Sequence, residues 1–228
     1  MSHKIWTIIP AAGIGQRFGS SVPKQYHKIN GKTIIEYAIN PFLQLTQCHK
    51  VIITLNPADT YFKKLKINQH HKMITVQGGA SRADSVLNAL HSISSEAHEN
   101  DWVLVHDAVR PCISKNEIQS FIAETLQDEV GGLLMAPSSD TLKSVSSNRI
   151  DQTLDREQIW RALTPQMFRF GLLMKGFSKS LNHITDESSA IEALNLKPKM
   201  IKGHPRNIKI TWDSDLTFAH AIINQNNL

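Results

Sequence analysis

Short runs of apolar residues recur along this chain, and the stretches between them carry apolar residues at helical spacing. Most of the runs are continuous rather than alternating, which is typical of strands in a sheet covered on both faces. The runs predict strands at 4–9, 50–55, 73–77, 102–106 and 132–136. The stretches between them predict helices at 34–45, 58–65, 83–93 and 117–126. Because strands and helices alternate, the expected fold class is α/β, with a three-layer, mostly parallel, Rossmann-like sheet.

Two of these helices have start signals. Ser81 with Asp84, and Ser114 with Glu117, have the residue types and spacing of a capping box. In such a box the first side chain and the acid three residues later satisfy each other's backbone N–H groups. The two helices are therefore expected to begin just after Ser81 and Ser114.

The alternation breaks after the last predicted strand. Residues 138–160 are mostly polar, with a turn at Ser146-Ser147-Asn148, and they predict a hairpin with too few apolar residues to form a core. Such a hairpin lies on the surface or packs against a second subunit. The later pattern predicts helices at 168–178 and 186–195, strands at 199–202 and 208–211 that pair, and a last helix from residue 215. We expect one domain, residues 1–228, with 138–160 as an arm.

Composition narrows the class of protein. A chain of 228 residues, 41% of them hydrophobic and 20% charged, is typical of a globular protein with one sizeable core. The net charge of +5 is spread without a basic run, so a nucleic-acid partner is not expected. No apolar run approaches the ~20 residues of a membrane span, and the first strand begins too early for a leader. Cys48 and Cys112 form neither a metal-spaced pair nor a disulfide framework, so we expect a soluble, cytoplasmic protein without a membrane partner.

The loop after the first strand carries the strongest chemical signal. Residues 8–26 read IIPAAGIGQRFGSSVPKQY, in which Gly13 and Gly15 mark a small-residue loop and the cations Arg17 and Lys24 follow. Backbone N–H groups exposed in such a loop bind anions, and an arginine fork and a lysine point charge suit phosphate oxygens. The loop therefore predicts a polyphosphate site. The alternative is a glycine-rich strand-to-helix turn that binds no ligand.

Two common phosphate motifs do not fit this loop. A P-loop requires Gly-Lys-Ser/Thr at its end, and no such tripeptide occurs within residues 8–26. The dinucleotide fingerprint requires a third glycine where Phe18 stands, with Gly19 one position late. The pair of Gly13 and Gly15 is weak evidence when taken alone.

Two further turns are expected in the same crevice, because ligands of open α/β sheets bind beyond the carboxyl ends of the strands. The turn at 77–85 offers backbone contacts at a helix start, although it is also compatible with an ordinary capped turn. In the turn at 106–111, Asp107 suits Mg²⁺ and Arg110 suits a second phosphorylated molecule. The alternative for Asp107 is a helix cap or an ion pair with Arg110. His106 is expected to be held by hydrogen bonds rather than to act as an acid or base.

With these turns in place, the chain closely resembles the 2-C-methyl-D-erythritol 4-phosphate cytidylyltransferases of the non-mevalonate isoprenoid pathway. The motifs that carry the resemblance are PAAGIGQRF with PKQY, GGASRADSV, VHDAVRPC, LDREQIWRALTPQMF, TDESSAIEAL and NIKIT. They occur in the family's order from end to end of the chain. The resemblance implies a nucleotidyltransferase that transfers a cytidylyl group from CTP to 2-C-methyl-D-erythritol 4-phosphate, giving 4-diphosphocytidyl-2-C-methyl-D-erythritol and pyrophosphate.

The resemblance also implies roles for individual residues. The catalytic residues would be Arg17, Lys24, Arg156 and Lys209. The nucleotide-binding residues would be Pro10, Ala11, Ala12, Gly13, Gly15, Gly79 and Ser85. The residues around the polyol phosphate would be Asp107, Arg110, Arg156, Thr164, Thr185 and Lys209. Asp107 would hold Mg²⁺ or another divalent cation, and the 138–160 arm of a homodimer would carry Arg156 into the partner's site.

The chemistry explains why such a site is rich in cations. The attacking group is a phosphate oxygen whose second pKa is about 6, so it is already largely dianionic at neutral pH and needs no general base. The obstacle is repulsion between two anions, since two unit charges ~4 Å apart cost roughly 4 kcal/mol at an effective dielectric constant near 20. Fixed cations and Mg²⁺ offset this repulsion during phosphoryl-type transfer.

Three alternatives stay open at this point. A ribitol 5-phosphate cytidylyltransferase shares the nucleotide half of the site, although segment 160–166 looks more like the isoprenoid enzyme. A catalytically idle nucleotide-binding regulator is disfavoured, because the expected cations and Asp107 are all present. An NAD oxidoreductase is disfavoured by the displaced third glycine, and by Glu36, which is predicted on a helix rather than at a strand end.

Overall fold

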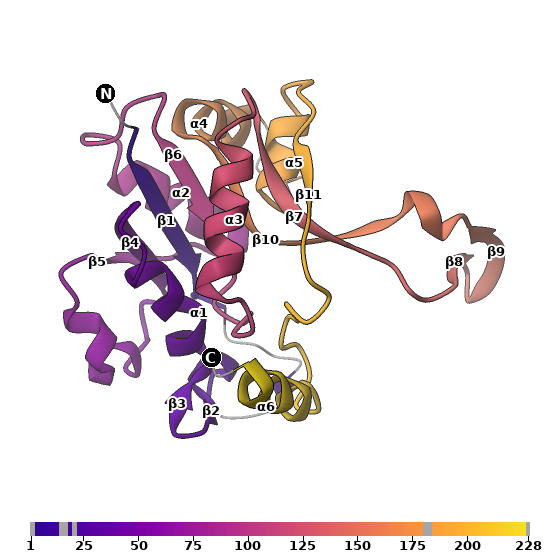
Figure 1. Cartoon of the computed structure of the whole chain (residues 1–228), viewed down its shortest axis with the longest axis horizontal. Helices are drawn as coiled ribbons and strands as arrows, with labels where there is room; N and C mark the ends of the chain where they lie inside the picture. Colours follow the sequence, from indigo (N-terminus) through magenta and orange to yellow (C-terminus); the bar gives the residue numbers. More distant parts are fainter. Residues whose placement is uncertain (1–2, 14–17, 20–21, 180–183, 227–228) are drawn as a thin grey trace.

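The fold is described from a computed structural model, which covers residues 3–13, 18–19, 22–179 and 184–226. Within these residues a seven-stranded sheet has the order β11-β7-β10-β6-β1-β4-β5 (Figure 1). Its strands are β1 (Ile5–Pro10), β4 (Cys48–Leu55), β5 (Met73–Gln77), β6 (Trp102–Val105), β7 (Gly131–Pro137), β10 (Trp160–Arg169) and β11 (Lys199–Lys202). All neighbouring pairs are parallel except those of β10, which runs antiparallel to β6 and β7. The expected mostly parallel α/β sheet is confirmed.

Helices cover both faces of the sheet. They are α1 (Ile34–Leu43), α2 (Arg82–Ser92), α3 (Lys115–Thr125), α4 (Phe170–Lys179), α5 (Glu187–Glu192) and α6 (Asp215–Asn226). One apolar cluster joins α1 and α3 to one face of the strands, and a second joins α2, α4 and α5 to the other face. Both faces of β6 are therefore buried, which is why its sequence is a continuous apolar run.

The predicted helix starts are correct. Ser81 and Ser114 each accept a hydrogen bond from the backbone N–H three residues later, and the carboxylates of Asp84 and Glu117 accept one from the backbone N–H of the cap residue. Reciprocal caps of this kind satisfy backbone donors that a helix leaves unpaired at its first turn. They fix the point at which α2 and α3 leave the sheet edge that carries the candidate site.

The helix predicted at 58–65 is wrong. Two short 3₁₀ turns, η3 (Phe62–Lys64) and η4 (Lys66–Gln69), take its place. The Asp59 carboxylate accepts hydrogen bonds from the backbone N–H groups of Tyr61 and Phe62. Local bonds from a side chain to the backbone compete with the bonds of an α-helix, so the apolar spacing alone was misleading.

The region after the hairpin also departs from the prediction. β10 occupies the middle of the sheet, where no strand was predicted, and it contains Pro165 although proline is disfavoured in central strands. The sheet accommodates it with a register irregularity between Ala162 and Gln166. The helix predicted from residue 168 begins at Phe170 instead. Residues 208–211 form no strand, and β11 pairs with β7 rather than with them.

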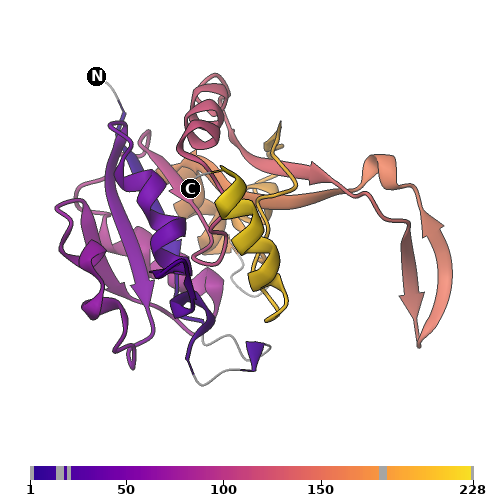
Figure 2. The same cartoon turned by 60° about the horizontal axis from the view of Figure 1, so that its bottom comes forward.

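The predicted hairpin is present as β8 (Leu142–Ser146) and β9 (Arg149–Leu154). It projects from the body of the molecule on two extended connections (Figures 1 and 2). Val145 and Ile150 are 59% and 66% exposed on it, so this chain alone does not cover its few apolar side chains. None of the helices in the described part of the chain has the length and apolar character needed to cross a membrane.

Candidate active site

A cleft lies at the carboxyl ends of β1, β5 and β6, where the three turns singled out in the sequence meet. Of the residues expected to bind the nucleotide, those that line it are Pro10, Ala11, Ala12, Gly13, Gly79 and Ser85. Lys24, Asp107 and Lys209 line it as well. Gly15 and Arg17 lie outside the described residues. The parallel sheet thus brings together segments that are far apart in the sequence, as expected for an open α/β fold.

Gln25 braces the loop after β1. Its side chain is buried, and its Nε2 donates to the carbonyl oxygens of Ala11 at 3.0 Å and Gly13 at 3.4 Å. Asn56 Nδ2 donates to the carbonyl oxygen of Ala12 at 3.4 Å. The carbonyl oxygens of residues 11–13 are therefore held by side-chain amides, which fixes the start of this loop beside the cleft.

The turn between β5 and α2 packs directly on that loop. A Cβ atom at Gly78 would clash with the Cβ atom of Ala12, so only glycine permits this approach. Ser85 Oγ accepts from the Gly79 backbone N–H at 3.1 Å and donates to the Ser81 carbonyl oxygen at 2.9 Å. Gly79 and Ser85 were predicted to contact a nucleotide. In the structure their hydrogen bonds order the turn itself.

Asp107, which directly follows the buried His106 at the end of β6, is the centre of a charge cluster. Its Oδ1 accepts from Arg82 Nε at 3.0 Å, and its Oδ2 lies 2.9 Å from Lys209 Nζ. Arg110 Nε lies 3.4 Å from the same Oδ2. Burial by itself would raise the pKa of Asp107, but these three cations outweigh it and hold the pKa far below its usual range. Asp107 is therefore a carboxylate that is charged at neutral pH, at the wall of the cleft.

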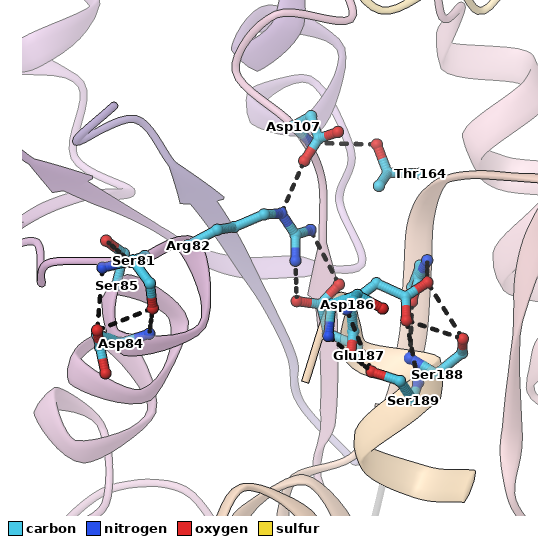
Figure 3. Close-up of polar contacts among 12 residues, drawn as sticks. Ser81, Arg82, Asp84, Ser85, Asp107, Thr164, Asp186, Glu187, Ser188 and Ser189 are labelled. Carbon is cyan, nitrogen blue, oxygen red and sulfur yellow. Dashed lines mark hydrogen bonds and ion pairs between the residues drawn. The ribbon is translucent and has the colours of Figure 1, made fainter. Parts of the chain in front are cut away.

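Arg82 has a second acidic partner. Its Nη1 and Nη2 donate to Oε1 and Oε2 of Glu187 at 2.8 Å and 3.0 Å, a bidentate pair (Figure 3). Glu187 lies in the first turn of α5 and is completely buried. One guanidinium group thus connects α2, α5 and the end of β6.

Arg110 and Thr164 lie behind Asp107 rather than on the cleft wall. Arg110 is buried, and its Nη1 donates to the Asn207 carbonyl oxygen at 2.7 Å. Thr164 Oγ1 accepts from the Asp107 backbone N–H at 3.1 Å and lies 3.0 Å from His106 Nδ1. In this structure both residues support Asp107, and the contact with a polyol phosphate expected of them stays a prediction.

The sequence profile of the IspD family, described as 2-C-methyl-D-erythritol 4-phosphate cytidylyltransferase, matches residues 5–225. The chain belongs to the IspD family. It is 42% identical over 227 residues to the 2-C-methyl-D-erythritol 4-phosphate cytidylyltransferase of Vibrio atlanticus (strain LGP32), covering 98% of this chain and 97% of that relative. It is 43% identical over 224 residues to the protein of the same name from Wigglesworthia glossinidia brevipalpis, covering 97% and 96%.

Solved structures agree with this family assignment. The crystal structure of Francisella tularensis 2-C-methyl-D-erythritol 4-phosphate cytidylyltransferase (IspD) matches with a TM-score of 0.84 and 35% identity, covering 96% of this chain and 99% of that one. The resemblance predicted from the motifs is confirmed. This IspD-family chain is a cytidylyltransferase, a nucleotidyltransferase enzyme.

Two residues that the IspD resemblance implicated lie away from the cleft of their own chain. Arg156 lies in η5 (Arg156–Gln158), within the 138–160 arm, and its exposed Nη1 donates to the Ser139 carbonyl oxygen at 3.0 Å. Thr185 is exposed just before α5, and its backbone N–H donates to Ser189 Oγ at 3.0 Å. Neither belongs to the cleft wall, which keeps open the expectation that Arg156 serves a second subunit.

His106 is held by hydrogen bonds, as expected. Its completely buried ring lies between Thr164 Oγ1 at 3.0 Å and the Arg110 carbonyl oxygen at 3.1 Å. Burial lowers the pKa of His106 from 6.5 to about 4, so the ring is neutral at pH 7. It therefore acts as a structural link between β6 and β10.

This lowered pKa predicts a pH-dependent stability. The unfolded chain binds a proton near pH 6.5 and the folded chain only near pH 4, so the stabilisation is complete above pH 6.5 and is lost as the pH falls to about 4. Between pH 6.5 and pH 4 we expect the unfolding free energy of the native chain to fall by about 3 kcal/mol more than that of His106→Gln. Urea unfolding at several pH values, without divalent cations, measures the difference. Equal pH dependence of the two proteins would contradict it.

Arg82, Glu187, Gln25 and Asn207 were assigned no role from the sequence, although each holds part of the site. Arg82 and Glu187 resemble the charged residues common in the first turn of many helices. A buried carboxylate has no local signature, because burial depends on elements distant in the chain. The only local signal near Arg82 and Glu187 is the helix-capping motif that each of them adjoins, and it marks a helix start rather than a site.

Proposed function

We propose that this enzyme transfers the cytidylyl group of CTP to 2-C-methyl-D-erythritol 4-phosphate, giving 4-diphosphocytidyl-2-C-methyl-D-erythritol and pyrophosphate. The observation that carries the proposal is the cleft itself. It combines the small residues 10–13 and Lys24 with the charged Asp107, which is paired with Arg82 and Lys209, in a chain that matches the family over nearly its whole length. Relatives at 42% identity are named 2-C-methyl-D-erythritol 4-phosphate cytidylyltransferases, which supports the same acceptor.

In the proposed mechanism the acceptor phosphate attacks the α-phosphate of CTP in line, and pyrophosphate leaves. Lys24 and Arg17 neutralise the charge on the triphosphate. Lys209, whose Nζ is 2.9 Å from Asp107 Oδ2, holds the acceptor phosphate. No side chain has to remove a proton, which agrees with a neutral and fully bonded His106 beside the site. Positioning and electrostatic stabilisation therefore supply the catalysis.

Mg²⁺, or another divalent cation, belongs to the same proposal. Among the described residues no group of three or more His, Cys, Asp and Glu side chains could hold a metal. Mg²⁺ does not need such a cage, because it commonly binds one or two carboxylates together with substrate phosphates and water. Asp107 fits that mode, since it is a charged carboxylate on the cleft wall. Both its oxygens already accept from cations, so the phosphates would hold the ion and Asp107 would add one ligand. The ion would supply further neutralisation of phosphate charge.

The decisive experiment is pyrophosphate release from CTP with a panel of polyol phosphates. We expect release with 2-C-methyl-D-erythritol 4-phosphate and Mg²⁺, little with ribitol 5-phosphate, and none after EDTA treatment until Mg²⁺ is restored. Faster release with ribitol 5-phosphate would favour that alternative acceptor. No release with any acceptor would indicate a nucleotide-binding protein without this activity.

The proposal includes a homodimer formed through the 138–160 arm. Its support is the hairpin that projects from the body with Val145 and Ile150 exposed, and the position of Arg156 away from its own cleft. A second copy would cover the apolar side chains and receive Arg156. A cytoplasmic location is part of the same proposal and is supported by two buried, unpaired cysteines.

Mixing two inactive variants tests the arm. Arg156→Ala and Lys24→Ala chains, unfolded and refolded together, are expected to recover roughly a quarter of native activity, since half the two-fold dimers are mixed and each mixed dimer has one intact site. Each variant refolded alone is the control. If Arg156 acts within its own subunit, the mixture stays as inactive as its components.

A further inference from the structure

Glu187 is a completely buried carboxylate that the proposed chemistry does not use. It lies in the first turn of α5, while the cleft is lined by the loops after β1, β5 and β6. A buried charge is costly unless it is paired, and a buried ion pair is often no more stabilising than well-packed apolar residues of the same volume. Stability alone therefore gives no reason for an acid at this position.

The geometry of its partner offers a reason. Two nitrogens of the planar Arg82 guanidinium donate to the Glu187 carboxylate, at 2.8 Å and 3.0 Å. The third nitrogen, Nε, donates to Asp107 Oδ1 at 3.0 Å. In Figure 3 the Arg82 side chain extends from α2 and ends between the two acids. Because the group is flat and rigid, fixing two nitrogens on Glu187 also fixes the direction of the third.

That direction decides how the charge on Asp107 is shared. With Arg82 on Oδ1 through a single nitrogen, Oδ2 stays available to Lys209 at 2.9 Å and Arg110 at 3.4 Å. Without Glu187, the Nη groups of Arg82 would need another acceptor, and Asp107 is the acid already in contact. A bidentate Arg82–Asp107 pair would compete with Lys209 for Oδ2.

We propose that Glu187 is a positioning residue for the transfer reaction. It holds the Arg82 fork so that Asp107 keeps Lys209 in place at the cleft. This inference rests on the proposed function of the cleft, to which it adds Glu187 of α5 as a residue that holds the cleft's side chains in place. The simpler alternative is that Glu187 only ties α5 to α2 and has no influence on the reaction.

A double-mutant cycle separates the two. Glu187→Gln keeps the size of the side chain and removes its charge. We expect kcat to fall about 10²-fold and KM for CTP to change much less, because a displaced Lys209 would weaken the transition state more than the binding of CTP. If Glu187 acts through Arg82, then Arg82→Gln and the double variant should have the same kcat, since the second change has nothing left to displace. Glu192→Gln, an exposed acid at the end of the same helix, is the matched control and should behave like the native enzyme.

Two results would overturn the inference: a folded Glu187→Gln enzyme with native kcat, or effects of Arg82→Gln and Glu187→Gln that multiply in the double variant. If Glu187→Gln fails to fold, different kcat values for Arg82→Gln and the double variant overturn the inference. If Arg82→Gln fails to fold, native kcat in Glu187→Gln overturns it. Crystal structures of the native and Glu187→Gln proteins give a readout without activity. Arg82 should leave its single contact with Oδ1 in the variant, and an unchanged Arg82 refutes the positioning role even if the native protein proves inactive with CTP.

Discussion

Replacing Lys24 by alanine is expected to lower kcat about 10²–10³-fold, the usual cost of losing one preorganised charge at a transition state. Lys24 lines the cleft beside the loop after β1, and its Nζ donates to the Ile210 carbonyl oxygen at 2.9 Å. That contact is only partly buried, so its loss should cost about 1 kcal/mol of folding stability. Steady-state kinetics with a thermal melt of the same sample separates the two effects.

Lys28→Ala is the matched control, because Lys28 is an exposed lysine close in sequence that does not line the cleft. It should keep native kcat and nearly native Tm. Native turnover in Lys24→Ala would remove Lys24 from the reaction. A large fall in Tm would instead mean that the lysine serves mainly to hold the segment around Ile210.

Asp107→Asn is expected to damage both stability and activity. The substitution keeps the shape of the side chain but leaves Arg82, Lys209 and Arg110 without their shared counter-charge. Breaking a buried ion pair on one side typically costs at least about 3 kcal/mol, which corresponds to roughly 6–12 °C in Tm for a chain of this size. We also expect kcat to fall about 10²-fold, since Lys209 loses the group that positions it.

Differential scanning calorimetry at pH 7 and kinetics on the folded fraction measure the two effects. Asp213→Asn is the control, because Asp213 is an exposed acid in the segment that follows Lys209. An Asp107→Asn protein as stable as this control would show that the three cations do not depend on Asp107. Loss of stability with native kcat would make Asp107 purely structural.

Local patterns predicted a large part of the fold. The apolar runs placed β1, β4, β5, β6 and β7 within a few residues, because strands covered on both faces, such as β6, are apolar along their whole length. The exceptions have identifiable causes. The Asp59 carboxylate accepts from the backbone that would have started a helix, and the unpredicted strand β10 contains Pro165 within a register irregularity.

The chemistry of the site was predicted less evenly. The three turns, with Lys24 and Asp107, were predicted from residue types and spacing, and Lys209 was predicted from the family resemblance. All three residues line one cleft. The roles expected of Arg110 and Thr164 as substrate contacts remain predictions, since both now support Asp107 from behind. Arg17 was singled out as well and lies outside the described residues.

The sequence by itself determined the alternation of strands and helices, the small-residue and cationic character of the loops, and the family, because each of these depends on neighbouring residues. Only the tertiary structure decided that Glu187 meets Arg82, which lies 105 positions earlier in the chain, and that both reach Asp107. Such a meeting depends on the strand order and on where each helix crosses the sheet. Short-range periodicity reports neither, so a buried acid and an ordinary surface acid look the same until the chain is folded.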